Sequence, residues 1–368
     1  MYANDIIEQK NSILNYIEII IFLRMITSII SLATCFIIIV LYLLLLYQVK
    51  FSNNPNKAES ENNNNTINNE TTINSNKTNK IGLGSHYMFF LVLSNFLSAL
   101  TEGSFYIKLY IIDQNSEKSK GYFEVFSKSN YCNIYAFFHN LFELSGICWT
   151  TMITKLFYNS TKIEITGTQK QQMTKAILYS LLFPLIICIF PFFFGGYGFA
   201  YTHCSFGKKE YLDDTNYTLS VIFGIILTIF ISCNALFTIY ALCKSYSFYK
   251  KKIKQLRDQN ESEYSSLKIY VKLFFIFPII IMVTRGMKLI QFFFDYIHKE
   301  DIKLIDIAFN YINSIFYCLT GTFDSAFCIF FFRGVYKNCC NSVNNQMSNI
   351  ETENMINNNF KEPITPTE

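Results

Sequence analysis

Three ionisable side chains that could bind a small molecule lie in apolar stretches of the chain, where charge is costly and usually functional. Glu143 and Arg285 each lie about nine residues below the outer end of an apolar stretch, roughly 13 Å deep at 1.5 Å per helical residue. Lys288 follows Arg285 by three residues, so both cations share one side of a helix. Guanidinium binds phosphate or carboxylate through two hydrogen bonds, so this site would suit an anionic ligand. An internal bridge between Arg285 and Glu143 is the alternative.

Two further candidates for the same ligand site are His139 and Glu102. His139 lies four residues before Glu143 and shares its helix face, a spacing compatible with a metal ion. Two ligands do not make a metal site, however, and we expect neither metal nor cofactor. The four histidines are scattered along the chain, and no nucleophile-elbow, H-E-x-x-H or phosphate-loop pattern is present. We therefore do not expect an enzyme.

A second polar level lies deeper in the same stretches. Asn95 and Asp324 come at similar depth and could couple helix movements during switching, or could simply hold two helices together. Pro278 lies in the same stretch as Arg285, where it removes a backbone hydrogen bond and should kink a helix. We treat these three residues as candidate switch residues.

The elements that must position these residues are membrane helices. The chain has 368 residues, of which 51% are hydrophobic and only 16% charged, whereas soluble domains carry about 25% charge. Seven apolar stretches are long enough to cross about 30 Å of hydrocarbon as helices: 25–47, 86–107, 134–158, 177–199, 217–242, 271–294 and 304–331. We predict an all-α membrane protein, a seven-transmembrane helix bundle.

The orientation of the bundle follows from its connections. Lys and Arg are concentrated in the first, third and fifth connections, which places these inside and the amino terminus outside. We predict an extracellular amino terminus at 1–24, a bundle at 25–331 and a cytoplasmic tail at 332–368. Residues 52–80 are rich in Asn and Thr and predict a disordered cytoplasmic loop. The amino terminus lacks the features of a cleaved signal peptide.

Cysteines and an Asn-x-Thr tripeptide mark the two membrane faces. Cys132 and Cys204 are the only cysteines in predicted outside segments, and we expect a disulfide between them, with two unrelated free thiols as the alternative. Asn216 is the candidate glycosylation site in an outside loop. Cys339 and Cys340 follow the last stretch next to basic residues and are candidate S-acylation sites, or else reduced surface thiols.

A short basic run lies in the fifth connection, which we predict to be an inside loop. Such a run attracts anionic lipids of the inner leaflet, and a partner protein could contact the same surface. The sequence leaves both open. The basic residues form one short run rather than a broad patch, so we expect no nucleic-acid partner. The run consists of Lys250, Lys251, Lys252, Lys254 and Arg257.

The motifs resemble those of the cyclic-AMP receptor-like family of G-protein-coupled receptors from social amoebae. The segment C-N-I-Y-A-F-F-H-N-L-F-E-L-S-G-I-C-W-T-T begins at Cys132 and contains a Trp-Thr pair at Trp149. F-P-I-I-I-M-V-T-R ends at Arg285, and L-T-G-T-F-D ends at Asp324, where the family has Asn. The resemblance covers about residues 20 to 340 and adds Trp149 to the candidate switch residues.

The resemblance implies a receptor that responds to an extracellular small molecule and activates a heterotrimeric G protein at the plasma membrane. Cyclic AMP is the ligand of the named family, but the long first inside loop and the short tail depart from that family and weaken this assignment. A retinal protein is disfavoured, because the stretch 304–331 has no Lys for a Schiff base. The alternative function is a multi-span transporter of a small solute, since the buried ionisable residues could also line a solute path.

Overall fold

The computed structural model describes residues 2–52, 83–115, 130–161, 168–200, 203–206, 214–257 and 319–329, with the single positions 279 and 312. The chain forms two compact units, one of residues 1–40 and 82–327 and the other of residues 41–81 and 328–368. Every contact discussed below lies within the first unit. The predicted sixth stretch, apart from position 279, most of the predicted loop 52–80 and the predicted tail lie outside the described residues.

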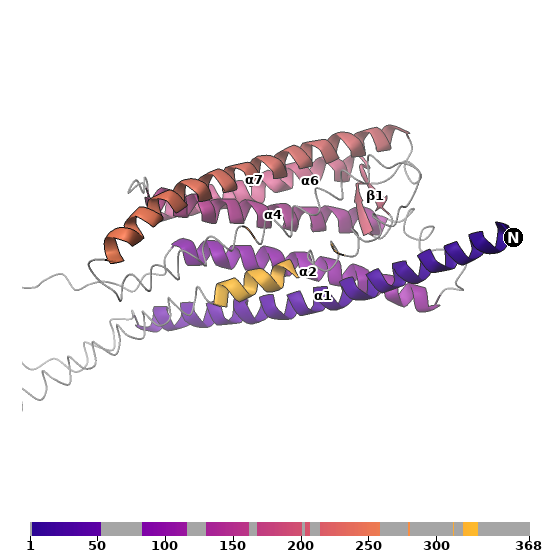
Figure 1. The fold of residues 1–368 in the computed structure, drawn as a ribbon, viewed down its shortest axis with the longest axis horizontal. Helices are drawn as coiled ribbons and strands as arrows, with labels where there is room; N and C mark the ends of the chain where they lie inside the picture. Colours follow the sequence, from indigo (N-terminus) through magenta and orange to yellow (C-terminus); the bar gives the residue numbers. More distant parts are fainter. Residues whose placement is uncertain are drawn as a thin grey trace, which may run out of the picture. The chain divides into compact units, whose positions relative to one another are not determined.

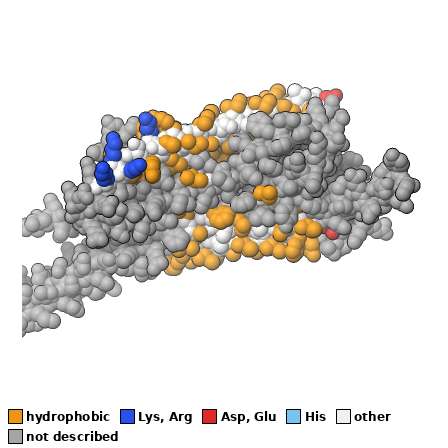
Figure 2. All heavy atoms as spheres, in the orientation of Figure 1, with side chains coloured by type: hydrophobic (Ala, Val, Ile, Leu, Met, Phe, Trp, Pro, Cys, Tyr) orange, Lys and Arg blue, Asp and Glu red, His pale blue; other side chains and the backbone are white. Residues whose placement is uncertain are grey.

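The described residues are almost entirely helical (Figure 1). The helices are α1 (Tyr2–Ser52), α2 (Leu83–Asn115), α4 (Asn130–Thr161), α5 (Gln169–Ile177), the π-helical turn η2 (Leu178–Leu182), α6 (Phe183–Phe193) and α7 (Asp214–Arg257), followed by a helical segment at 320–329. Four described segments are long and apolar enough to cross a membrane: Glu18–Tyr47, Leu83–Ile111, Gln169–Phe193 and Asp214–Lys251. Large apolar side chains lie exposed along them (Figure 2), as expected of a surface that faces lipid.

Helix α4 lies at the centre of the described bundle. It packs against α2, α6 and α7 and against the strands β1 and β2. Although α4 is 32 residues long, it is not among the four apolar spans, because it contains many polar residues. Most of these polar side chains are buried. The predicted stretch 134–158 is thus a helix, but one shielded by protein on several sides.

The first helix is longer than the sequence analysis predicted. No Gly or Pro interrupts residues 2–52, and α1 begins at Tyr2, so the helix includes most of the segment 1–24 that we predict to be extracellular. Its apolar span begins at Glu18 rather than at residue 25, because Ile19 to Leu23 extend the lipid-compatible surface. This shift places Arg24 inside the span.

The predicted fourth stretch ends earlier than residue 199. Gly195 has a positive φ of 69°, a conformation that favours glycine and ends a helix. The Gly196 amide donates to the Pro191 carbonyl at 2.8 Å and closes this helix end. The chain then forms a hairpin that the all-α prediction lacked, made of β1 (Tyr197–Ala200) and β2 (His203–Phe206), with Phe199 opposite Cys204.

The prediction that the basic run lies in a loop is wrong. Helix α7 continues to Arg257, and no Gly or Pro lies between Gly224 and Arg257 to stop it. Lys250, Lys251 and Lys254 are exposed on this extension. Lys252 and Arg257 belong to the same helix.

Candidate functional site

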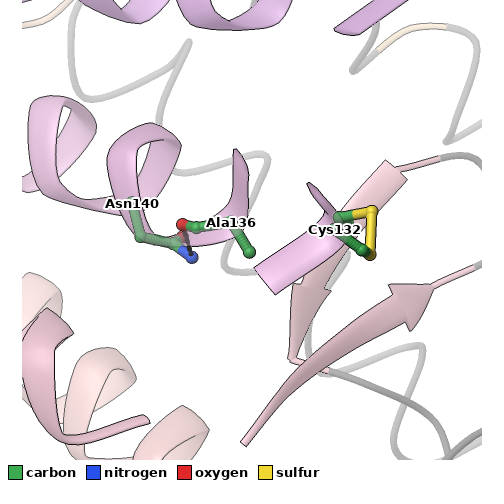
Figure 3. Close-up of a disulfide and its surroundings, with 4 residues drawn as sticks. Cys132, Ala136 and Asn140 are labelled. Carbon is green, nitrogen blue, oxygen red and sulfur yellow. Dashed lines mark hydrogen bonds between the residues drawn. A yellow bond between two sulfur atoms is a disulfide. The ribbon is translucent and has the colours of Figure 1, made fainter. Parts of the chain in front are cut away.

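A disulfide fixes one end of the bundle. Cys132 at the start of α4 is bonded to Cys204 in β2, with 5.3 Å between their Cα atoms (Figure 3). Both cysteines are buried in a cluster with Tyr197 and other aromatic side chains. The Tyr197 hydroxyl donates to the Cys188 carbonyl at 3.1 Å, and burial raises the pKa of Tyr197 well above its usual value. The hairpin is therefore anchored to both α4 and α6.

Buried rings connect α2 to the two ligand-site candidates of α4, His139 and Glu143. Phe105 stacks on Tyr135 with 4.1 Å between ring centroids, and Tyr135 stacks on His139 at 5.3 Å. His139 Nε2 lies 3.8 Å from Glu143 Oε2. Both side chains are buried, and the structure brings them together as their spacing predicted.

A buried cation that the sequence analysis missed lies in the same end of the bundle. Arg24 of α1 is 4% exposed and donates a hydrogen bond to the Tyr106 hydroxyl of α2. Its guanidinium carbon lies 5.6 Å from the centre of the Tyr106 ring. Glu102, which is also buried, lies one turn before Tyr106 on α2. We call Arg24, Glu102, Tyr106, His139 and Glu143 the disulfide-side cluster.

Deeper contacts set α2 against α4 in antiparallel register. Ser94 and Ser145 are hydrogen-bonded at 3.1 Å. Trp149 stacks on Phe90 with ring centroids 5.0 Å apart and contacts Tyr87 at 5.6 Å. Trp149 is fully buried, so this candidate switch residue lies between α4 and α2.

The structure brings Asn95 and Asp324 together. The Asn95 amide of α2 donates to the Asp324 carboxylate of the 320–329 segment, and both residues are buried. The 320–329 segment also packs on α1, where Ser325 Oγ lies 3.4 Å from Cys35 Sγ. A Cβ at Gly321 would overlap Ser31 Oγ and lie 3.1 Å from Cys35 Sγ, so a larger residue here would force the Ser31 side chain to move.

A third polar junction involves Asn234, which the sequence analysis did not single out. Its side-chain oxygen accepts hydrogen bonds from Thr151 of α4 at 2.9 Å and from Tyr179 of η2 at 2.7 Å. The π-helical turn that carries Tyr179 precedes Pro184, whose ring and missing N–H disturb regular α-helical bonding. An Asn in an apolar stretch was the only sequence signal for this junction.

The remaining predicted positions have different outcomes. Asn216 lies in the first turn of α7, where we expected a loop, and its amide would lie 3.3 Å from a Cβ at Gly195. Arg285, Lys288, Pro278, Cys339 and Cys340 lie outside the described residues. In the part of the chain that is described, no group of three or more His, Cys, Asp or Glu side chains could hold a metal ion.

Comparison with known proteins gives a match in fold. No protein-family model and no curated protein sequence matches the chain. The crystal structure of squid rhodopsin is similar, with a TM-score of 0.56 over 85% of this chain and 81% of that chain at 14% sequence identity. At this identity the similarity concerns the fold alone. The chain is thus a multi-pass membrane protein whose fold is similar to that of squid rhodopsin.

Proposed function

We propose that the chain is a G-protein-coupled receptor of the cyclic-AMP receptor-like type, located in the plasma membrane with its amino terminus outside. The observation that carries this proposal is the likeness in fold to squid rhodopsin over most of both chains. The short motifs around Trp149, Arg285 and Asp324 support the narrower family. The 320–329 segment supports a seven-helix arrangement, since Ser31 faces Gly321 and Cys35 faces Ser325, the parallel relation expected of a first and a seventh helix.

The ligand site of this receptor is the disulfide-side cluster. Arg24 supplies a buried cation, and Glu102, His139 and Glu143 supply polar groups that fix the orientation of a ligand. A phosphate or carboxylate ligand matches the guanidinium, and cyclic AMP is one member of that class. Arg285 and Lys288 are the further cations proposed for this site from the sequence.

Ligand binding shifts the bundle toward an arrangement that activates a heterotrimeric G protein at the opposite end. Such a shift requires the ligand to bind the active arrangement more tightly than the resting one. The Asn95–Asp324 bond joins α2 to the last described segment and is the element that we assign to this transition. Trp149 and Pro278 are assigned to it as well.

A transporter is the alternative, because buried acids such as Glu102 and Glu143 also suit a solute path. The fold likeness does not favour it. Solute uptake that follows a proton gradient and is abolished by Glu143→Gln would establish the transporter instead.

The proposed ligand site is tested by G-protein dissociation in cells that express the chain. The cells receive cyclic AMP or, separately, medium conditioned by the source cells. Arg24→Gln should abolish the response, whereas Lys108→Gln, which removes an exposed cation of α2 stacked on Tyr131 at 3.6 Å, should leave it intact. Surface labelling confirms equal expression. A full response from Arg24→Gln would remove Arg24 from the ligand site, and a response to conditioned medium alone would exclude cyclic AMP.

A further inference from the structure

The carboxyl-terminal part of α7 carries a row of exposed lysines. Lys244, Lys250, Lys251 and Lys254 are all exposed, and Figure 2 shows Lys and Arg side chains gathered at this end of the helix. Positions 240, 244, 247, 251 and 254 follow the alternating spacing of four and three residues that keeps side chains on one helix face. Lys250 lies at the edge of the same face. We call these four residues the lysine stripe.

The lysine stripe points away from the helix bundle. The opposite face of α7 is buried at Ala241, Leu242 and Ser245. Tyr249, also on that side, stacks on Phe157 of α4 with 4.7 Å between ring centroids. The lysines therefore continue the surface of α7 that faces lipid nearer the middle of the helix.

The position of the membrane boundary can be estimated from α7 itself. Its exposed aliphatic side chains run from Ile222 to Ile239, about 26 Å at 1.5 Å per residue, which is close to the roughly 30 Å of a hydrocarbon layer. The exposed apolar residues that follow, Tyr240, Tyr246 and Phe248, are all aromatic, and tyrosine is enriched at membrane interfaces. Lys244 lies one turn beyond Tyr240, with its ammonium 5.8 Å from the centre of the Tyr240 ring. Side chains on a helix lean toward its amino terminus, so the later lysines lean back toward the membrane.

The charge of this surface has one sign. Helix α7 contains no Asp or Glu after Asp214, which lies at the other end of the helix. Four ammonium groups thus occupy about 15 Å of helix without an acid on the same helix to neutralise them. The complementary partner is an anionic surface at the membrane boundary.

We propose that the lysine stripe binds the headgroups of anionic phospholipids in the leaflet at this end of α7. The lipid is favoured over a G protein as the occupant, because the lysines extend the lipid-facing side of the helix rather than the side packed on α4. The proposal requires that the protein is inserted in a membrane, but it does not require receptor activity. The lipid site and the proposed function can therefore be tested independently.

The proposal is tested on the full chain carrying Tyr240→Trp, which places a fluorescent reporter beside the stripe at the membrane boundary. The protein is reconstituted into phosphatidylcholine vesicles that contain brominated phosphatidylserine or, in parallel, brominated phosphatidylcholine. Bromine quenches a neighbouring indole, so the two quenching curves give the relative affinity of the adjoining lipid positions. Trp149 is the only native tryptophan and is fully buried, and the native chain supplies its background signal.

Two variants that lose the same number of positive charges distinguish a specific lipid site from an effect of the protein's net charge. The stripe variant replaces three lysines by glutamine, Lys250, Lys251 and Lys254. The control variant makes the same change at three exposed lysines of α4 and α5, Lys155, Lys170 and Lys175. Circular dichroism verifies that both retain the native helix content.

We expect the native stripe to favour phosphatidylserine by about fivefold or more at low salt, since each lysine near an anionic surface contributes roughly that factor. The preference should fall severalfold in the stripe variant, which retains Lys244, and persist in the control variant. It should also decrease in about 1 M salt, where the Debye length is about 3 Å. Equal affinity for both lipids in the Tyr240→Trp chain with all four lysines, or an unchanged preference in the stripe variant, would overturn the proposal. Equal losses in both variants would also overturn it, by showing an effect of net charge. A stripe variant that keeps its lipid preference but loses G-protein activation would assign the lysines to a protein partner instead.

Discussion

The hydrogen-bonded pair Asn95 and Asp324 can be tested by exchanging the two residue types, which should affect stability in a specific order. Asn95→Asp places two carboxyl groups against each other and removes the amide donor. Because Asn95 is 5% exposed and Asp324 is fully buried, water cannot replace the lost bond. A hydrogen bond to a charged group contributes about 1.5–3 kcal/mol, so this variant should lose about that much free energy of unfolding. The double variant Asn95→Asp with Asp324→Asn restores a donor opposite an acceptor.

The assay is a double-mutant cycle read by the apparent melting temperature of the purified chain in mild detergent. Asp324→Asn alone should have the smaller effect, because one amide can still donate to the other. We expect Asn95→Asp to lower the melting temperature by several degrees and the exchange to recover most of the loss, a coupling of at least about 1 kcal/mol. An exchanged variant that is as unstable as the sum of the two single variants would refute the role of this bond.

Three further variants test the packing around the candidate site, each by its melting temperature. Gly321→Ala should lower the free energy of unfolding by about 1–3 kcal/mol through overpacking against Ser31. The control Gly103→Ala should be nearly neutral, because its Cβ would meet only ordinary contacts, and equal effects of the two variants would contradict the close approach at Gly321. Cys204→Ser should lower the free energy of unfolding by about 2–4 kcal/mol, because it removes the disulfide to Cys132. A reducing agent should destabilise the native chain but not this variant, and a variant that is equally sensitive to the reducing agent would contradict the stabilising role of the disulfide. Trp149→Ala should lower the free energy of unfolding by about 3–5 kcal/mol, because it leaves a buried cavity where the indole ring was packed. A variant as stable as the native chain would show that the ring is not packed as described.

Hydropathy and spacing predicted the features that depend on one helix at a time. Apolar stretches of about 20 residues identified the four described spans, and the i, i+4 spacing placed His139 beside Glu143. Depth along each stretch placed Asn95 at the level of Asp324, since every residue of a helix advances by the same 1.5 Å. Helix α4 was also predicted, although polar residues interrupt its apolar stretch.

The features that were missed depend on where neighbouring helices lie. Arg24 interrupts the apolar run, so the sequence placed the membrane boundary after it, yet its bond to Tyr106 makes its burial acceptable. Asn234 carried no sequence motif, because its partners Thr151 and Tyr179 come from two other elements. The extension of α7 was read as a loop because lysines suggest solvent, although solvent exposure does not end a helix.

The central claim is that the chain activates a heterotrimeric G protein, and nucleotide exchange measures this most directly. The full chain is reconstituted in vesicles with a purified G protein from the source cells, and GTP binding is followed with and without cyclic AMP or conditioned medium. We expect exchange to be faster than with protein-free vesicles, to increase with one of the two stimuli, and to lose that increase in Asn95→Asp. Exchange at the rate of protein-free vesicles under every condition would contradict the receptor assignment.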